Sequence, residues 1–559
     1  MIKKNSIKLV LIFLLALIVR YWRVGSYPPL LWDEAALGYN AYSILKTGRD
    51  EYGHRFPLIF KSFGDYKPGF YLYLSLPFIA LLGLNELAIR LPSVIFGALT
   101  PIFLYFLVKN LFQKPRLALW SSLVLALLPW QIHFSRGAWE VNLMTSFLVL
   151  ASWLWFQTKN LPLALALVAF SLGIYQGAKL LVPLIGFGWL IFSWPERKKI
   201  KLNLNPRSYF LSGLILFLIL IWYGLSFVGP AKNRLKVMSL FTYPRPEREV
   251  KEILNEDGLT KKNWHFYLFH HQSFYFLRGF LTRYFNHFSP RFLAFDGDWT
   301  NPRHSAPYFG VIGRVNFVLF LLGLITFLSQ KHPFSAYFLF YWLLLAPLPA
   351  ALSRDIITGV RSFSLVIPLA VFIAWGIEKI LGWQQLIQIK SFLGKKILFY
   401  SFVLALLGFY LLDFVYWWDL YSVHMVKKSP KDWLFGYKEV IEYLTQRETE
   451  FDQILVTDFY GQPYIYYLFY RQYPPRQYQK QAQLIENQFG DVGRVEKIDK
   501  IIFGPIDKAK AENCSHCLVI FAEDELLRTG LYHQQQFFTQ LKPLGRINQS
   551  ALFYAYEKK

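Results

Sequence analysis

The first apolar run of the chain reads Leu9-Val-Leu-Ile-Phe-Leu-Leu-Ala-Leu-Ile-Val19, and it follows the basic residues Lys3, Lys4 and Lys8. Such a run predicts a helix that crosses a membrane, because a bilayer needs about 20 residues of helix and a spanning segment has to satisfy its own backbone hydrogen bonds. No small-x-small cleavage site follows, so we expect a retained helix rather than a cleaved signal peptide. Several further runs of comparable length lie along the chain.

The overall composition fits a membrane protein and not an ordinary soluble domain. Hydrophobic residues make up 54% of the chain and aromatic residues 19%, with a mean hydropathy of +0.28. The formal net charge is +24, but many of the Lys and Arg residues sit in short loops between apolar runs, as the positive-inside rule requires. No nucleic-acid-binding motif is present, and we expect no nucleic-acid partner.

The basic loops also predict the topology. The clusters are Lys109 to Arg116, Lys159, Arg197 to Lys201, Lys331 with His332, and Lys390 to Lys396. All of them are cytoplasmic if residues 68–84, rich in Tyr, Pro and Gly, form a helix at the interface instead of a span. The result is a mainly α, multi-pass bundle of about eleven helices of spanning length, with the N-terminus inside and the C-terminus outside. The expected spans are 8–24, 88–108, 117–133, 142–157, 161–175, 180–194, 208–227, 308–328, 334–349, 362–382 and 397–416.

This topology divides the chain into a transmembrane domain, 1–416, and a soluble extracytoplasmic domain, 417–559. Two large outer loops follow from it, at about 25–87 and 228–307. The second domain reads as α/β, since its short β-rich runs alternate with helical patterns. The expected elements are strands at 453–457 and 517–521 and a helix at 433–445.

The chain has two cysteines, Cys514 and Cys517. One Cys-x-x-Cys pair supplies too few ligands for a structural zinc site. A local disulfide is consistent with an extracytoplasmic location, and two free thiols are the alternative; the sequence does not decide between them.

Two groups of polar residues stand out in the first outer loop. Asp33 and Glu34 follow the first helix and begin the amphipathic stretch 35–46. The plain structural interpretation is a helix N-cap, because Asp accepts a backbone N–H and Glu suits the first turn. Lys67 precedes Pro68 at the start of the interfacial segment, where it meets a lipid phosphate or simply anchors the loop at the headgroups.

Taken together, these motifs resemble the first loop of the GT-C glycosyltransferases. The resemblance rests on Asp33-Glu34 after the first helix, Lys67-Pro68 further along the loop, and Arg90-Leu-Pro-Ser93 at the next helix. The most similar branch is that of the protein O-mannosyltransferases and the lipid A aminoarabinose transferases. The match covers roughly residues 1–200, and the soluble tail matches no motif.

The resemblance implies a GT-C-like fold and a polyprenyl-phosphate-linked sugar as donor, used on the outer face of the membrane. It implies that Asp33 is catalytic, with Glu34 beside it, and that Lys67 contacts the donor phosphate. The sequence departs from many relatives in having Lys-Pro-Gly, with Gly69 in place of a second Pro. We expect no cofactor, and the sequence leaves open whether a divalent metal takes part.

Further candidates for substrate binding lie at other outer helix ends. Arg136 and Glu140 resemble an Arg–acid pair of the family, and Lys179 and Arg361 share the same predicted membrane face. Each has a plain alternative as an interfacial anchor or a weak surface ion pair. The His and Asp residues of loop 228–307 match no metal motif, so we interpret them as solvated loop residues and expect no metal site.

The chemistry expected from these residues is a single displacement with inversion. A carboxylate serves as general base towards an acceptor hydroxyl, and fixed cations stabilise the departing phosphate. The acceptor itself is not identified by the sequence and is a lipid, a glycan or a protein. The alternatives are a transporter or flippase of lipid-linked saccharides, and a non-catalytic assembly protein.

Overall fold

The structure is a computed structural model, and it describes residues 2–157, 160–197, 206–225, 238–383, 392–486, 492–530, 532 and 539–558. Lys159, Lys198, Lys199, Lys201 and Lys390 of the predicted cytoplasmic clusters lie outside these residues. The chain forms two compact units. The first unit comprises 1–16, 98–133 and 144–418, and the second comprises 17–97, 134–143 and 419–559.

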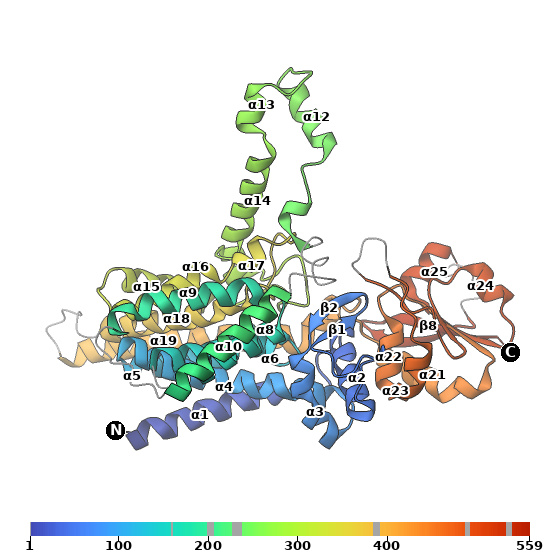
Figure 1. Cartoon of the computed structure of the whole chain (residues 1–559), viewed down its shortest axis with the longest axis horizontal. Coiled ribbons are helices and arrows are strands. Elements are labelled where there is room, and N and C mark those ends of the chain that lie inside the picture. The colour runs from blue at the N-terminus through green and yellow to red at the C-terminus, as the bar shows by residue number, and fades with distance from the viewer. Residues whose placement is uncertain are drawn as a thin grey trace. The chain divides into compact units, whose positions relative to one another are not determined.

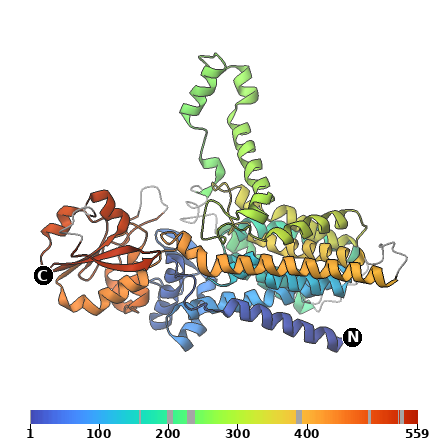
Figure 2. The ribbon, with the colours of Figure 1, turned by 180° about the vertical axis from the view of Figure 1, so that it is seen from behind.

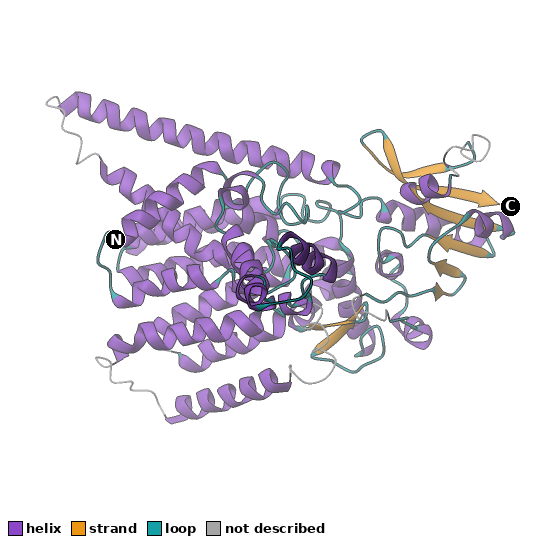
Figure 3. Cartoon of the chain, turned by 90° about the horizontal axis from the view of Figure 1, so that it is seen from above, coloured by secondary structure: helices purple, strands orange, loops and turns teal. Residues whose placement is uncertain are grey.

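The first unit consists mainly of apolar helices that run side by side, together with a helical hairpin, residues 247–286, that stands across them (Figures 1 and 3). Its elements are α5 (Pro115–Leu127), α8 (Leu161–Ile174), α9 (Ala178–Arg197), α10 (Pro206–Leu225), η1 (Leu240–Thr242), α12 (Glu247–Glu256), α13 (Trp264–Phe269), α14 (Gln272–Asn286), η2 (Arg291–Phe295), α15 (Arg314–Leu328), η3 (Phe334–Ala336), α16 (Tyr337–Leu345), α17 (Leu348–Ala351), η4 (Phe363–Leu365) and α18 (Val366–Gly382). The boundary between the units falls within α1 (Ile2–Tyr21), α4 (Glu86–Phe112), α6 (Pro129–Ser135), α7 (Glu140–Gln157) and α19 (Phe392–Asp419).

Within this bundle α15 packs closely on α18. A Cβ atom on Gly323 would overlap the Phe372 carbonyl oxygen, and one on Gly376 would overlap the Leu319 carbonyl oxygen. Small residues at a helix crossing let two backbones approach closely, which is how helices associate where lipid supplies no hydrophobic drive. The two glycines therefore fix the contact between these helices.

Every predicted span overlaps a described helix, but the predicted number of spans is not confirmed. Among the described residues, four helices are long and apolar enough to cross a membrane, and a bent pair makes up to five. Some of the other predicted spans are short helices, such as α8 with 14 residues, which reaches only about 21 Å at 1.5 Å per residue. The coarse prediction of a mainly helical membrane protein is confirmed.

The predicted span 117–133 also needs correction, because it is not one straight helix. It breaks between α5 and α6 with a bend of 57°. Leu128 has an extended backbone there, and Pro129 follows it. The residue before a proline is disfavoured in the helical region, and the proline lacks the N–H that would continue the helix. The Trp130 N–H instead donates to the Val311 carbonyl at 3.0 Å.

The second unit combines the loop 25–87, which we predict to be outer, with the C-terminal residues 419–559. Its elements are α2 (Trp32–Thr47), β1 (Ile59–Ser62), β2 (Asp65–Pro68), α3 (Phe70–Leu82), η6 (Leu420–His424), α20 (Met425–Lys428), α21 (Tyr437–Arg447), η7 (Glu448–Glu450), β3 (Gln453–Val456), α22 (Pro463–Tyr470), α23 (Pro475–Gln481), β4 (Lys497–Ile498), β5 (Ile501–Phe503), α24 (Lys508–Asn513), β6 (Cys517–Ala522), α25 (Glu523–Thr529), β7 (Lys542–Ile547) and β8 (Ser550–Lys558).

The C-terminal part of this unit contains the expected small α/β sheet. Its six strands have the order β4-β5-β3-β6-β8-β7, and β5, β3 and β6 are parallel. β6 is buried along its whole length, as its continuous apolar sequence suggests for a strand covered on both faces. Cys514 and Cys517 are joined by a disulfide at the start of this strand. Helices of the domain lie against the sheet (Figures 1 and 2).

Candidate active site

Asp33 and Lys67 are brought together within the second unit. Asp33 lies in the first turn of α2, and Lys67 lies on β2 opposite Phe60 of β1. The Lys67 ammonium donates a hydrogen bond to Asp33 Oδ1. The Asp33 side chain is 46% exposed and that of Lys67 17% exposed. The pair therefore joins a solvent-accessible carboxylate to a largely buried cation.

The N-cap interpretation of Asp33 is wrong. The N-cap of α2 is Leu31, whose backbone is extended and whose own side chain makes no capping hydrogen bond. The Leu31 N–H instead donates to Glu34 Oε2 at 3.1 Å. The carboxylate of Asp33 is thus not needed to begin the helix.

Glu34 faces a different cation, the fully buried Arg90 of α4. Arg90 Nε and Nη2 donate to the two Glu34 oxygens at 2.8 and 2.7 Å. The Ala138 N–H also donates to Glu34 Oε1 at 2.7 Å. This bidentate, buried arrangement is the strong form of an Arg–carboxylate contact. It fixes the first turn of α2, which also carries Asp33.

Arg90 also fixes the chain between α1 and α2. Its Nη1 atom donates to the carbonyls of Val24 and Pro28, both at 2.9 Å, and Nη2 donates to Pro29 at 3.2 Å. Sequence reasoning noticed Arg90 only as part of a motif and missed this role. The available signal was an arginine at the start of an apolar helix, since such a buried charge requires a partner.

Arg136 is fully buried and binds the backbone around the first loop. Its guanidinium donates to the Val19 carbonyl at 3.0 Å, to the Tyr27 carbonyl at 3.2 Å and to Tyr421 Oη at 3.0 Å. The structure therefore places this candidate against the end of α1 and against η6.

Glu140 lies at the start of α7, just before the predicted span, and interacts electrostatically with the Asp33–Lys67 pair. Burial raises the pKa of Glu140 to about 7, while Lys67 acts to lower it and Asp33 to raise it. Burial alone would lower the pKa of Lys67, but Asp33 and Glu140 together raise it above its usual value. Lys67 is therefore a stable cation with two acidic neighbours.

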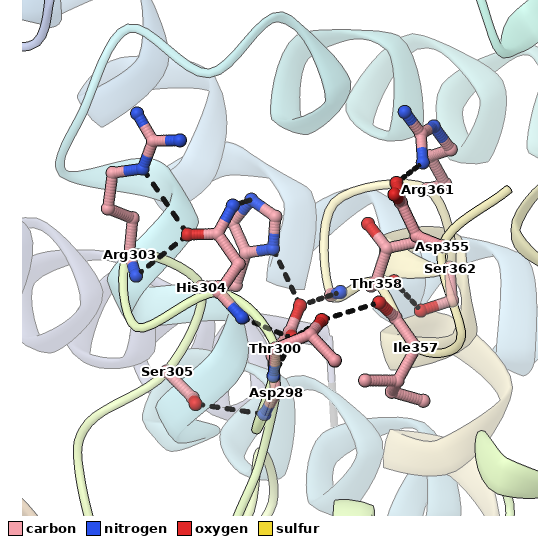
Figure 4. A network of polar contacts seen from close by, with 12 residues as sticks. Asp298, Thr300, Arg303, His304, Ser305, Asp355, Ile357, Thr358, Arg361 and Ser362 are labelled. Carbon is pink, nitrogen blue, oxygen red and sulfur yellow. Dashed lines mark hydrogen bonds and ion pairs between the residues drawn. The ribbon is translucent and has the colours of Figure 1, made fainter. Parts of the chain in front are cut away.

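Lys179 and Arg361 belong to the first unit. Lys179 is buried at the start of α9, where its carbonyl accepts a hydrogen bond from Tyr223 Oη at 3.1 Å. Arg361 forms an ion pair with Asp355 (Figure 4) and donates to Ser353 Oγ at 3.1 Å. Both residues therefore belong to a different unit from the Asp33–Lys67 pair.

The interpretation of the His and Asp residues of loop 228–307 as solvated is wrong for three of them. His287, Asp298 and His304 are buried. Asp298 Oδ2 accepts from His304 Nδ1 at 2.6 Å and from the Gly359 N–H at 2.8 Å (Figure 4). Among the described residues, no three His, Cys, Asp or Glu side chains are grouped so as to hold a metal ion.

A cavity of 640 Å³ lies beside Trp32, the residue before Asp33. Its walls include the aromatic residues Phe459, Tyr460 and Tyr464 from the segment that follows β3. Gly461, with a φ of +149°, packs against the Trp32 ring so closely that a Cβ atom would overlap it. The Tyr466 hydroxyl also donates to the Leu30 carbonyl at 2.9 Å. The C-terminal domain thus contributes directly to the surroundings of the pair.

Comparison with known proteins identifies similar sequences and folds. Residues 66–223 match the family model described as dolichyl-phosphate-mannose-protein mannosyltransferase. A search of curated proteins found no match. The resemblance to the GT-C glycosyltransferases, first inferred from the loop motifs, is confirmed.

Solved structures give the whole-chain comparison. ArnT from Cupriavidus metallidurans bound to undecaprenyl phosphate has a TM-score of 0.52 and 10% sequence identity, with 98% of this chain and 97% of that chain covered. ArnT in the apo state gives the same TM-score, 12% identity and the same coverage. An oligosaccharyltransferase from Archaeoglobus fulgidus aligns with 10% identity and a TM-score of 0.46, over 83% of this chain and 63% of its own length. At these identities the ArnT likeness shows a shared fold.

Proposed function

We propose that this chain is a membrane glycosyltransferase of the GT-C type, which moves a sugar from a polyprenyl-phosphate donor to an acceptor hydroxyl on the extracytoplasmic face. The observation that carries the proposal is the contact between Lys67 and the half-exposed carboxylate of Asp33. The sequence match over 66–223 and the ArnT-like fold support the same assignment. The sugar and the acceptor stay unspecified.

In the proposed reaction Asp33 is the general base. It takes the proton of the acceptor hydroxyl as the acceptor oxygen forms a bond to the anomeric carbon of the donor. The bond between that carbon and the phosphate oxygen breaks at the same time, and its electron pair leaves with the phosphate. One displacement without a protein nucleophile inverts the anomeric configuration.

Lys67 is the proposed cation for the donor phosphate. In the structure it pairs with Asp33, and a phosphate oxygen would compete for the same ammonium group. A cation fixed next to the leaving group stabilises the charge that develops as the glycosidic bond breaks. Partial release of Asp33 from this ion pair would then leave its carboxylate available to the acceptor.

The remaining candidates receive supporting roles in this proposal. Glu34 and Arg136 are proposed to position the loop, because their described contacts lie with Arg90 and with backbone carbonyls. Glu140 is proposed to tune the charge around Lys67. Lys179 and Arg361 stay proposed donor-binding cations of the first unit. The cavity beside Trp32 is the proposed approach for the acceptor, since aromatic walls suit a partly apolar ligand.

The proposal includes the topology predicted from the basic loops. In this proposal the N-terminus is cytoplasmic, about eleven helices cross the membrane, and residues 417–559 form the extracytoplasmic domain. Loops 25–87 and 228–307 lie on the same outer side. The disulfide between Cys514 and Cys517 supports this location, because disulfides persist outside the reducing cytoplasm.

One experiment on the wild-type chain separates the enzyme from its alternatives. Purified protein in liposomes is given a donor labelled in the sugar, with a panel of hydroxyl acceptors, and the release of free polyprenyl phosphate is measured. The transferase releases polyprenyl phosphate only with acceptor present. A flippase instead moves intact donor between leaflets and releases none, and an assembly protein does neither.

A further inference from the structure

A second cavity, of 680 Å³, lies in the first unit at the foot of the hairpin formed by α12, α13 and α14. Four arginines and two carboxylates line it: Arg245, Arg278, Arg283, Arg354, Glu249 and Asp355. We refer to it as the arginine cavity. None of its lining residues belongs to the Asp33–Lys67 pair or to the polar residues that contact it.

Positive charge exceeds negative charge in the arginine cavity. Arg245 is paired with Glu249 at 3.3 Å, while Asp355 is already bound by Arg361 and lies 3.9 Å from Arg354. Arg278 is exposed and makes no hydrogen bond or ion pair with the part of the chain that the structure describes. A ligand with negative charge would complete this cluster.

Arg283 shows the same deficit in a more buried position. Two of its guanidinium nitrogens donate to the carbonyls of Gly279 and Arg354, at 3.0 and 3.1 Å. Its Nε atom is buried without a hydrogen-bond partner among the described residues. Burial also lowers the pKa of Arg283. A buried donor without a partner carries a free-energy cost that a bound anion would remove.

The loop that carries Arg354 and Asp355 on one wall of the cavity is tied to a neighbouring segment by hydrogen bonds just after these two residues. Asp298 accepts the Gly359 N–H, and Thr300 Oγ1 donates to the Ile357 carbonyl at 3.1 Å (Figure 4). On the other wall, the Tyr284 hydroxyl of α14 donates to the Leu344 carbonyl at 2.8 Å. Both walls are therefore preformed, as expected of a binding site.

The hairpin runs across the direction of the bundle. α14 stands at a steep angle to α15, α16 and α18 in Figures 1 and 2, and it is seen nearly end-on in Figure 3. If the bundle helices cross the membrane, a helix at a steep angle to them runs roughly along the membrane plane. One face of α14 leaves Phe274, Leu277, Leu281 and Phe285 exposed, with the spacing of a single helical stripe.

The tip of the hairpin has the composition of a membrane-surface segment. Trp264, Tyr267 and Phe269 of α13 are more than half exposed, and Lys261 and Lys262 precede them. Trp and Tyr favour the headgroup region, and lysines add attraction to anionic lipid. The exposed apolar surface therefore suits lipid as its neighbour.

We propose that the arginine cavity binds the phosphate of a lipid headgroup in the outer leaflet, while the hairpin lies along the bilayer surface and its apolar stripe contacts the acyl chains. Arginine suits this ligand because its planar guanidinium binds phosphate oxygens in pairs. The proposal rests on the outer location of loop 228–307 and does not depend on the transfer reaction.

The test measures binding of dioleoyl phosphatidic acid to the full chain in neutral detergent by native mass spectrometry. Dioleoylglycerol, which lacks the phosphate, and inorganic phosphate are measured beside it. Arg278→Glu is compared with Arg248→Glu, a matched reversal on α12 at an arginine that lies outside the cavity and is 90% exposed. Arg278→Lys keeps the charge but loses the paired geometry.

We expect Arg278→Glu to weaken binding of the phosphatidic acid by about tenfold or more, as for loss of a hydrogen bond to a charged group. Arg278→Lys should fall between it and wild type, and Arg248→Glu should match wild type. Dioleoylglycerol should bind poorly to every form. Equal binding by Arg278→Glu and wild type, or an equal loss in Arg248→Glu, overturns the site. Inorganic phosphate binding as tightly as the lipid overturns the assignment to a headgroup.

Discussion

At the scale of single residues, two neighbouring carboxylates have separate tasks. Asp33 and Glu34 are adjacent on α2, and successive helical side chains point about 100° apart. Asp33 consequently meets Lys67, while Glu34 meets Arg90. The motif in the sequence predicts an important acidic pair but not this division, because the partners come from distant positions whose approach depends on the folded loop.

Lys67→Ala tests the proposed phosphate contact. We expect KM for the donor to rise about 10-fold to 100-fold, which corresponds to the 1.5–3 kcal/mol of a hydrogen bond to a charged group. Lys61→Ala is the matched control, since Lys61 lies on the same hairpin with an 18% exposed side chain and pairs with Glu486. Equal donor kinetics for both variants and wild type would leave Lys67 as an interfacial anchor only.

The raised pKa of Glu140 predicts that donor binding depends on pH. Its pKa is raised to about 7, so the carboxyl is protonated below that pH and ionised above it. Ionisation adds a negative charge near Lys67, which competes with the donor phosphate. KM for the donor should therefore rise as the pH increases through about 7.

Glu140→Gln should keep KM low and flat between pH 6 and 8, because its side chain does not titrate. The phosphodiester of the donor keeps its charge over this range, so the substrate adds no transition of its own. An identical pH profile of KM in the variant and the wild type would show that Glu140 does not act on the donor site.

At the scale of elements, the β1–β2 hairpin positions Lys67, and Gly69 ends it. The Gly69 N–H donates to the Leu58 carbonyl at 3.0 Å, and a Cβ atom on Gly69 would overlap the ring of Phe60. A proline here would lose the hydrogen bond and clash with that ring. The Lys-Pro-Gly departure from the family pattern therefore has a local structural reason that the sequence alone did not supply.

Gly69→Ala should lower the free energy of unfolding by about 1–3 kcal/mol, the usual cost of overpacking a tight site. It should also raise KM for the donor, because the added methyl group displaces Lys67. Gly213→Ala is the control, because nothing lies within 4 Å of a Cβ at that position on α10. The melting temperature and donor kinetics in detergent measure the effect. If Gly69→Ala melts and binds donor like Gly213→Ala, the hairpin does not set the position of Lys67.

Elements were predictable from the sequence where a local pattern determines them. The strands at 453–457 and 517–521 occur as β3 and β6, and residues 68–84, which we predict to lie at the interface, contain the short helix α3. The break between α5 and α6 was not predicted from the sequence, although Pro129 lies there. A proline within an apolar run is compatible with either a kinked helix or a turn, so it does not decide between them. Helix length also failed as a guide, because α3 with 13 residues is hardly shorter than α8.

At the scale of the whole molecule, the C-terminal domain packs with the first outer loop in one compact unit. Contacts such as Tyr466 with Leu30 and Tyr39 with Tyr473 join segments more than four hundred residues apart. Hydropathy and motifs describe each segment separately, so the sequence could not predict that this domain borders the Asp33–Lys67 pair. The disulfide was likewise left open by the sequence.

The topology is tested by labelling single introduced cysteines in intact cells with a membrane-impermeant maleimide. Lys261→Cys in loop 228–307 should be labelled directly, whereas Lys331→Cys should be labelled only after permeabilisation. Both positions are exposed in the structure, so accessibility within the fold does not bias the comparison. The reverse pattern would contradict the proposed orientation.

The most direct test of the central claim is the transfer rate of Asp33→Asn. The substitution keeps the shape of the side chain and an oxygen that accepts from Lys67, and Asp33 does not cap its helix, so the variant should fold and bind donor. Asp65→Asn, on β2 of the same hairpin, is the control and should retain wild-type turnover. We predict that Asp33→Asn lowers the release of polyprenyl phosphate by about 10²–10⁴-fold, the usual contribution of general acid–base catalysis. Wild-type turnover in Asp33→Asn would contradict the assignment of Asp33 as the general base.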